Sequence, residues 1–177
     1  MIEFLFAQYK DYPYYLIALE LVAVVFGVIS VLYARKNNIL VYPTGLVSTI
    51  LYVYILYEFQ LYGDLIINFY YTIMSFLGWY LWAKTKDGND EFPISNINRK
   101  EILVSTLIFT ITLTFVALVY HFFDKFTNWT AYVDALTTGL FFVGMWLMAK
   151  RKIENWILWI IADAISIPLY FYKGLTF

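Results

Sequence analysis

The sequence predicts an all-α integral membrane protein with six transmembrane helices, and three observations support this class. Hydrophobic residues make up 62% of the 177 positions and charged residues only 14%, against about 25% charged residues in a typical soluble domain. Six apolar runs have about the 20-residue length that a helix needs to cross a bilayer. The loops between the runs are short, apart from the polar stretch 84–100.

The six predicted helices form one membrane domain over residues 1–177. They are Tyr14–Ala34, Ile39–Tyr57, Leu65–Ala83, Ile102–His121, Ala131–Ala149 and Trp156–Tyr172. We interpret the first run as a transmembrane helix and not as a signal peptide. It is too long for that role, and residues 1–13 lack a basic leader and a small-residue cleavage site.

The distribution of Lys and Arg predicts the orientation of the chain. Nine of the twelve basic residues lie in alternate loops, at positions 35–36, 84–100 and 150–152, and the opposite side holds only Lys10, Lys125 and Lys173. Cytoplasmic loops carry the excess of Lys and Arg in membrane proteins. We therefore expect the N-terminus outside the cytoplasm.

Composition argues against several function classes. The net charge of −1 argues against nucleic acid as a partner, and the absence of cysteine excludes thiolate metal sites and cysteine nucleophiles. The single histidine, His121, ends an apolar run, where we interpret it as an interfacial residue. No GxxxxGK[ST] loop is present, which argues against direct ATP drive. We expect a protein that is not an enzyme and needs no cofactor or metal.

The second and sixth helices resemble each other. A basic turn leads into each, and the helix before each carries one acid near its start, Glu20 or Asp134. When the two helix pairs are aligned with Ser48 at the position of Asp163, they predict an internal repeat. Residues 1–83 form the first three-helix repeat, 84–121 a loop and linker helix, and 122–177 a partial second repeat. A linker that crosses the membrane an odd number of times gives both repeats the same orientation.

Asp163 is the most informative of the three acids inside the crossings, because no Lys or Arg lies inside a crossing to pair with it. A carboxylate at a helix centre costs roughly 2.5 to 3.5 kcal/mol to insert. Three- and four-residue steps relate Asp163 to its neighbours and predict one helix face. That face consists of Trp156, Trp159, Asp163, Ser166 and Tyr170. A carboxylate beside indole rings suits a flat cation; interfacial aromatics and helix packing are the structural alternative.

Other polar residues inside the crossings are candidates for the same cavity. Ser48 is the predicted repeat partner of Asp163, and Asn68 forms a stripe with Tyr71 and Ser75 on the third helix. An amide can donate and accept hydrogen bonds, which suits sugar hydroxyls or a carboxamide. An interhelical hydrogen bond is the alternative for Asn68.

The stretches "ENWILWIIADAISIPLY" and "QLYGDLIINFYYTIMSFLGWYLW" resemble the Pnu-type vitamin transporters over nearly the whole chain. This resemblance implies seven crossings arranged as three, one and three, so that the seventh helix would be lacking here. It also implies a bacterial inner-membrane transporter that contacts its substrate through Trp156, Trp159, the position of Asp163 and Asn68.

The resemblance further implies facilitated diffusion of a small cationic vitamin, trapped by cytoplasmic phosphorylation. Nicotinamide riboside is the leading substrate, because Asp163 favours a cation over neutral riboflavin. Thiamine transport and proton-coupled transport of a cationic metabolite remain alternatives. The expected partners are this vitamin and the lipid bilayer, with a homo-oligomer possible.

Overall fold

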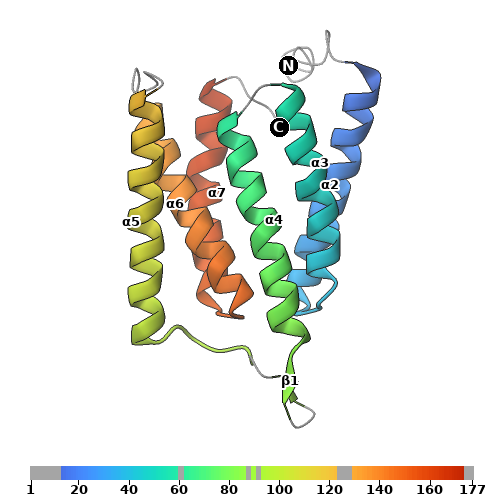
Figure 1. Cartoon of the computed structure of the whole chain (residues 1–177), viewed down its shortest axis with the longest axis vertical. Helices are drawn as coiled ribbons and strands as arrows, with labels where there is room; N and C mark the ends of the chain where they lie inside the picture. Colours follow the sequence, from blue (N-terminus) through green and yellow to red (C-terminus); the bar gives the residue numbers. More distant parts are fainter. Residues whose placement is uncertain (1–12, 60–61, 87–88, 91–92, 123–128, 174–177) are drawn as a thin grey trace. The chain divides into compact units, whose positions relative to one another are not determined.

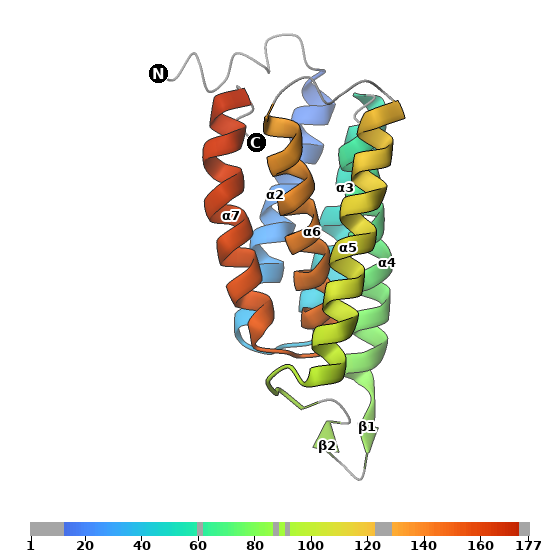
Figure 2. The ribbon, with the colours of Figure 1, turned by 90° about the vertical axis from the view of Figure 1, so that its left-hand side faces the viewer.

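The structure, a computed structural model, describes residues 13–59, 62–86, 89–90, 93–122 and 129–173. These residues contain six helices and a pair of two-residue strands (Figure 1). The helices are α2 (Tyr14–Arg35), α3 (Val41–Glu58), α4 (Tyr62–Ala83), α5 (Arg99–Phe122), α6 (Thr130–Ala149) and α7 (Glu154–Lys173). The strands β1 (Thr85–Lys86) and β2 (Asn89–Asp90) pair antiparallel beyond the end of α4 (Figure 2).

The all-helical class is confirmed, and each predicted helix agrees with an observed one to within three residues at either end. Three helices, α2, α5 and α6, are long and apolar enough to cross a membrane by length and composition. A helix suits such sequences because it satisfies its backbone hydrogen bonds internally, where lipid offers no partner. The count of six crossings stays a prediction.

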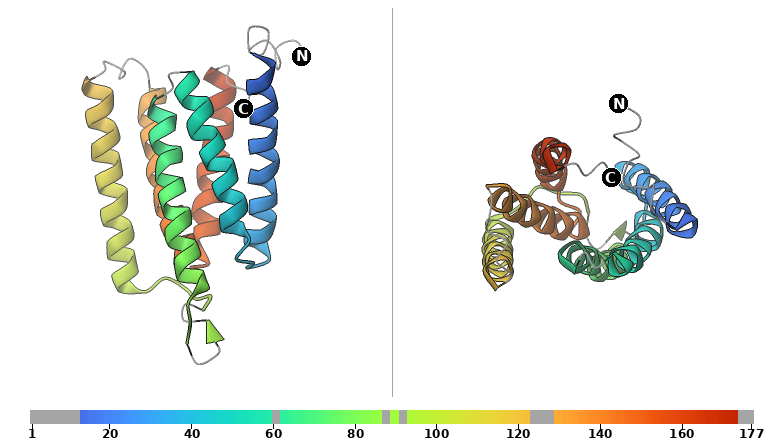
Figure 3. Two further views of the ribbon diagram at one scale, coloured as in Figure 1. Left: turned by 45° about the vertical axis from the view of Figure 1, so that its right-hand side comes forward. Right: turned by 90° about the horizontal axis from the view of Figure 1, so that it is seen from above.

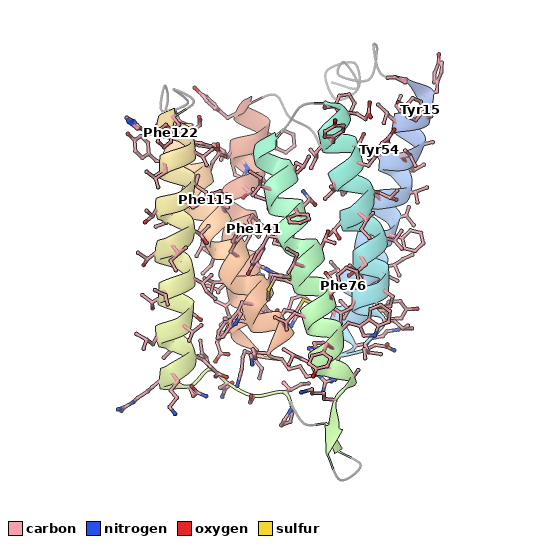
Figure 4. All side chains as sticks on the ribbon, in the orientation of Figure 1. Tyr15, Tyr54, Phe76, Phe115, Phe122 and Phe141 are labelled. Atoms are coloured by element: carbon pink, nitrogen blue, oxygen red, sulfur yellow. The ribbon has the colours of Figure 1, made fainter. Side chains whose placement is uncertain are left out.

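Large apolar side chains are exposed along the helices, the reverse of the pattern in a soluble protein. On α5, Leu103 is 71% exposed and Phe122 is 78% exposed. Phe115 and Phe122 project outward from α5, and Phe76 projects from α4 (Figure 4). Lipid tails solvate such surfaces without cost, so the exposure fits a multi-pass membrane protein.

The chain divides into two compact units, Met1–Glu91 and Phe92–Phe177. In the first unit, α3 packs against both α2 and α4 (Figure 3). In the second unit, α6 packs against both α5 and α7. The division falls inside the polar stretch 84–100, and α5, the predicted linker helix, packs within the second unit.

The α2–α3 turn and the α6–α7 turn have the same backbone geometry. Asn37 and Arg151 have positive φ angles of 51° and 54°, a conformation rare for residues other than glycine. The Asn38 N–H donates to the Tyr33 carbonyl at 3.0 Å, and the Lys152 N–H to the Leu147 carbonyl at 2.9 Å. These bonds close a Schellman-type helix end in both turns. Each residue of the second turn lies 114 positions after its counterpart.

This spacing changes the register that the sequence predicted for the two helix pairs. With a spacing of 114 residues Glu20 still corresponds to Asp134. Thr49, and not Ser48, corresponds to Asp163. Ser48 corresponds instead to Ala162. The predicted register was wrong by one residue because it matched polar residue types, whereas the turn fixes where each following helix begins.

Candidate substrate-binding residues

One stripe of α7 is buried against α6. Ala162 is fully buried, and Asn155, Ser166 and Leu169 are each at most 6% exposed. Trp159 also contacts α6, because a Cβ built on Gly144 would lie 2.5 Å from Trp159 Cδ1. Only glycine leaves room for the indole at that point of α6, and this contact fixes where the ring lies.

The neighbouring flank of α7 is exposed and carries Asp163. Ile160 is 66% exposed and Ile167 is 56% exposed, and the Asp163 side chain between them is exposed as well. The structure records no hydrogen bond or ion pair for the Asp163 carboxylate among the described residues. Glu20 and Asp134, by contrast, each make a hydrogen-bonding or electrostatic contact.

Trp156 links the two stripes of α7. It is half-buried, and its ring meets Trp159 edge-to-face, with centroids 5.8 Å apart and planes at 81°. Asp163 follows Trp159 by four residues, a step at which side chains are neighbours on a helix surface. Trp156, Trp159 and Asp163 therefore follow one another along α7, with the two indoles in contact.

The residues predicted to share one face of α7 differ in their burial. Ser166 lies in the stripe packed on α6, and Asp163 lies on the exposed flank. Their step of three residues allows both positions, because successive residues at this spacing drift around the helix. Tyr170 belongs to the predicted set but lies outside the residues whose side chains the structure describes.

The predicted residues of the first unit have packing contacts. Ser48 is buried on α3, and its Oγ would lie 3.2 Å from a Cβ built on Gly27 of α2. Asn68 and Tyr71 are half-buried on α4. The Asn68 carbonyl accepts a hydrogen bond from Thr72 Oγ1 at 2.9 Å, and the Tyr71 ring lies beside Tyr70, with centroids 6.0 Å apart.

The flank of α3 that corresponds to the Asp163 flank is covered by α4. The hydroxyl groups of Thr49 and Thr72 are hydrogen-bonded to each other, with their oxygen atoms 3.0 Å apart. Tyr42, the counterpart of Trp156, packs edge-on against Trp82, with centroids 5.1 Å apart. Leu46 is therefore only 6% exposed, against 66% for its counterpart Ile160.

Ser48, Asn68 and Tyr71 belong to the first unit, and the α7 residues belong to the second. Convergence of the two groups on one cavity stays a prediction. Sequence reasoning missed Gly144 and Thr49. Gly144 had a signal, since small residues in apolar helices often mark close helix packing. Thr49 had none until the turn fixed the register.

Comparison with known proteins places these residues in a family. Residues 17–177 match the family described as nicotinamide mononucleotide transporter. The nicotinamide riboside transporter PnuC of Neisseria mucosa is 27% identical over 156 residues, which cover 84% of this chain and 58% of that protein. The Escherichia coli nicotinamide riboside transporter PnuC is 24% identical over 183 residues, covering 88% of this chain and 75% of that protein.

The fold also matches a solved structure. The crystal structure of the vitamin B3 transporter PnuC is similar with a TM-score of 0.67 and 24% identity, over 99% of this chain and 78% of that one. At this identity the match concerns the fold. The chain spans 58% of the length of the Neisseria mucosa relative.

Proposed function

The chain belongs to the nicotinamide mononucleotide transporter family, and we propose that it carries nicotinamide riboside across the bacterial inner membrane. The two relatives described above are nicotinamide riboside transporters. Nicotinamide riboside is a flat heteroaromatic cation. The observation that carries the proposal is the Asp163 carboxylate, which is exposed on α7 beside the Trp156–Trp159 pair and has no recorded partner among the described residues.

The physical argument combines two attractions. A desolvated cation over an indole face gains about 2 kcal/mol, and a carboxylate about 4 Å away adds about 4 kcal/mol at an effective dielectric constant near 20. A carboxylate at this depth is costly to keep without a counter-ion. A cationic substrate supplies that counter-ion each time it binds, so the same residue that costs stability gives selectivity over neutral riboflavin.

We propose that the chain is built from two parallel repeats, a first of three helices and a partial second of two helices joined by a linker helix, and that both repeats contribute binding residues. The shared turn geometry at a spacing of 114 residues supports the repeat. In this arrangement Asp163 occupies the flank that α4 covers in the first repeat, and Asn68 and Tyr71 contribute from α4. The basic loops at 35–36, 84–100 and 150–152 face the cytoplasm, where phosphorylation traps the vitamin after facilitated diffusion.

Titration of the purified protein with nicotinamide riboside, thiamine and riboflavin tests the proposal. We expect saturable quenching of tryptophan fluorescence by one or both cations and none specific to riboflavin. Asp163→Asn should weaken binding of the cation at least tenfold, whereas Glu58→Gln, the loss of an exposed acid at the end of α3, should not. Equal affinity of Asp163→Asn and the parent would remove the counter-ion role, and tighter thiamine binding would reassign the substrate.

Proton coupling is a separate alternative, because an unpaired carboxylate within a membrane helix can also relay protons. Uptake by proteoliposomes, with and without an imposed pH gradient, distinguishes the two mechanisms. Facilitated diffusion predicts equal initial rates. Acceleration by an inward proton gradient would support coupling.

A further inference from the structure

Pro168 interrupts the backbone hydrogen bonds of α7 close to the candidate binding residues. It lies inside the helix Glu154–Lys173. Because proline has no backbone N–H, the carbonyl four residues earlier lacks the donor that a helix normally provides. That carbonyl belongs to Ala164, the residue directly after Asp163. A backbone acceptor is therefore released next to the Asp163 carboxylate.

No hydroxyl group replaces the missing donor. In α5 the hydroxyls of Thr106 and Thr110 each donate to the carbonyl four residues earlier at 2.9 Å, and Ser or Thr side chains can satisfy a carbonyl released by proline in the same way. For the Ala164 carbonyl, the residues three and four positions later are Ile167 and Pro168, and neither has a hydroxyl. Among the residues that the structure describes, no side-chain donor to this carbonyl is recorded.

The released carbonyl lies on the exposed flank of α7. Ala164 and Pro168 are exposed, whereas Ala162 and Ser166 belong to the stripe buried against α6. A backbone carbonyl without a donor is costly in hydrocarbon, because lipid tails cannot donate a hydrogen bond. The carbonyl therefore needs a donor from outside the described part of the chain, just as the Asp163 carboxylate needs a cation.

Helix geometry gives the order of the groups on this flank. At 100° and 1.5 Å per residue, Asp163 lies about 40° around the helix and about 6 Å along it from Trp159. Ala164 lies about 100° and about 1.5 Å further in the same directions. The carboxylate therefore lies between the indole and the released carbonyl, and the Cα atoms of Asp163 and Ala164 are about 3.8 Å apart.

We propose that the Ala164 carbonyl accepts a hydrogen bond from a ribose hydroxyl of nicotinamide riboside, and that Pro168 is a positioning residue that keeps this carbonyl free. This role rests on the proposed function. In nicotinamide riboside the ribose is attached to the positively charged ring nitrogen. When the ring stacks on an indole with its charge at Asp163, the ribose extends beyond the carboxylate, on the side where the carbonyl lies.

The first unit has no proline at this position. With a spacing of 114 residues, Tyr54 of α3 corresponds to Pro168, and Ile50 corresponds to Ala164. Tyr54 has a backbone N–H, so α3 can continue its hydrogen bonds through this position. A proline here therefore occurs only in the repeat that carries Asp163, which favours a role in binding over a role in the helix packing of both repeats.

Pro168→Ala tests the proposal, because it restores the N–H that occupies the carbonyl. The probes are nicotinamide riboside and 1-methylnicotinamide, which has the same cationic ring with a methyl group in place of the ribose. Both are titrated calorimetrically against the purified protein. The parent should bind the riboside at least fivefold more tightly than 1-methylnicotinamide.

Pro168→Ala should weaken riboside binding about fivefold, the change expected for one hydrogen bond of about 1 kcal/mol. Its affinity for 1-methylnicotinamide should change less than twofold. The melting temperature should not fall, because alanine is favoured over proline inside a helix. A folding defect would affect both ligands and lower the melting temperature.

Pro43→Ala is the matched control. Pro43 lies in the first turn of α3, where a backbone N–H has no partner within the helix. The carbonyl four residues earlier, that of Ile39, already accepts a hydrogen bond from the Tyr42 N–H at 3.1 Å. The affinity for both ligands should therefore stay unchanged in this variant.

Three results would overturn the role of the Ala164 carbonyl. The first is equal affinity of the parent for the two ligands. The second is a Pro168→Ala variant that binds the riboside like the parent or loses affinity equally for both ligands. The third is riboside binding that needs sodium in the parent but not in Pro168→Ala, since backbone carbonyls also bind this ion in transporters.

Different results separate this role from the proposed function. A parent protein that binds neither ligand would overturn both. If the riboside binds the parent and loses affinity in Asp163→Asn but not in Pro168→Ala, the proposed function stands and only the role of the carbonyl is overturned.

Discussion

Gly144→Ala should displace the Trp159 indole and weaken substrate binding. The added methyl group would lie 2.5 Å from Trp159 Cδ1, closer than two carbon atoms can approach. Overpacking of this kind costs about 1 to 3 kcal/mol, and the gain in helix propensity from glycine to alanine, about 1 kcal/mol, offsets part of it. The ring must move away from α6 to avoid the methyl group, and this movement would disturb its edge-to-face contact with Trp156.

The expected affinity loss follows from that movement. A stacking face contributes about 1 to 3 kcal/mol per ring, so we expect Gly144→Ala to weaken nicotinamide riboside binding about tenfold, measured by calorimetric titration. The melting temperature should fall only slightly. Gly27→Ala is the matched control, because its added methyl would meet Ser48 Oγ at 3.2 Å, and a serine hydroxyl can rotate away.

A double-mutant cycle decides whether the contact is responsible. In a Trp159→Ala background, Gly144→Ala should cost little, because the ring that it displaces is gone. Directly contacting residues show coupling of about 0.5 to 3 kcal/mol. The same cycle measured on thermal stability does not depend on the ligand. Additive effects in both assays would refute the assignment of Trp159 to the Gly144 contact.

Three further predictions concern other contacts. Thr72→Val should lose the interhelical hydrogen bond to Thr49 and destabilise the protein by about 0.6 kcal/mol, the average for such bonds in membranes, as measured by thermal unfolding. Lys152→Met should lower the melting temperature more, because it leaves Glu101 unpaired at a site where both side chains are at most 18% exposed; the loss should be about 1 to 3 kcal/mol. Asp163→Cys should react with a charged, water-soluble thiosulfonate and be protected by nicotinamide riboside, whereas Ala162→Cys, at a fully buried position, should not react.

Controls and contrary outcomes follow from the same contacts. Thr110→Val removes a hydroxyl bonded only within α5, so a loss as large as that of Thr72→Val would show that the interhelical bond contributes nothing. For Lys152→Met the comparison is Lys100→Met at an exposed position. The natural chain has no cysteine, so thiol reactivity reports only the introduced residue. An unreactive Asp163→Cys variant would place that flank against lipid or protein, since thiosulfonates react with thiolates, which form in contact with water.

Apolar run length was sufficient to predict the helices, because a helix is the one local structure that satisfies its backbone in lipid. The same argument could not predict which side of α7 packs on α6. Trp159 and Ser166 face α6 and Asp163 does not, and this depends on Gly144, more than a dozen residues earlier in the chain. In soluble proteins hydrophobicity marks the buried face, but α7 has apolar residues on every side, and its packed stripe also includes the polar Asn155 and Ser166.

The two helix pairs show how one backbone arrangement can serve packing in one unit and binding in the other. In the first unit, Ser30 of α2 faces Gly45 of α3, and a Cβ on Gly45 would lie 3.0 Å from Ser30 Oγ. At a spacing of 114 residues their counterparts are Gly144 and Trp159. The glycine of this contact therefore lies on the second helix of the first pair and on the first helix of the second pair. This exchange allows α7 to carry an indole where α3 has only a hydrogen atom. Thr49, which is hydrogen-bonded to Thr72 of α4, corresponds to Asp163 at the same register, so α7 carries a charge on the flank that the first unit uses to pack α3 against α4.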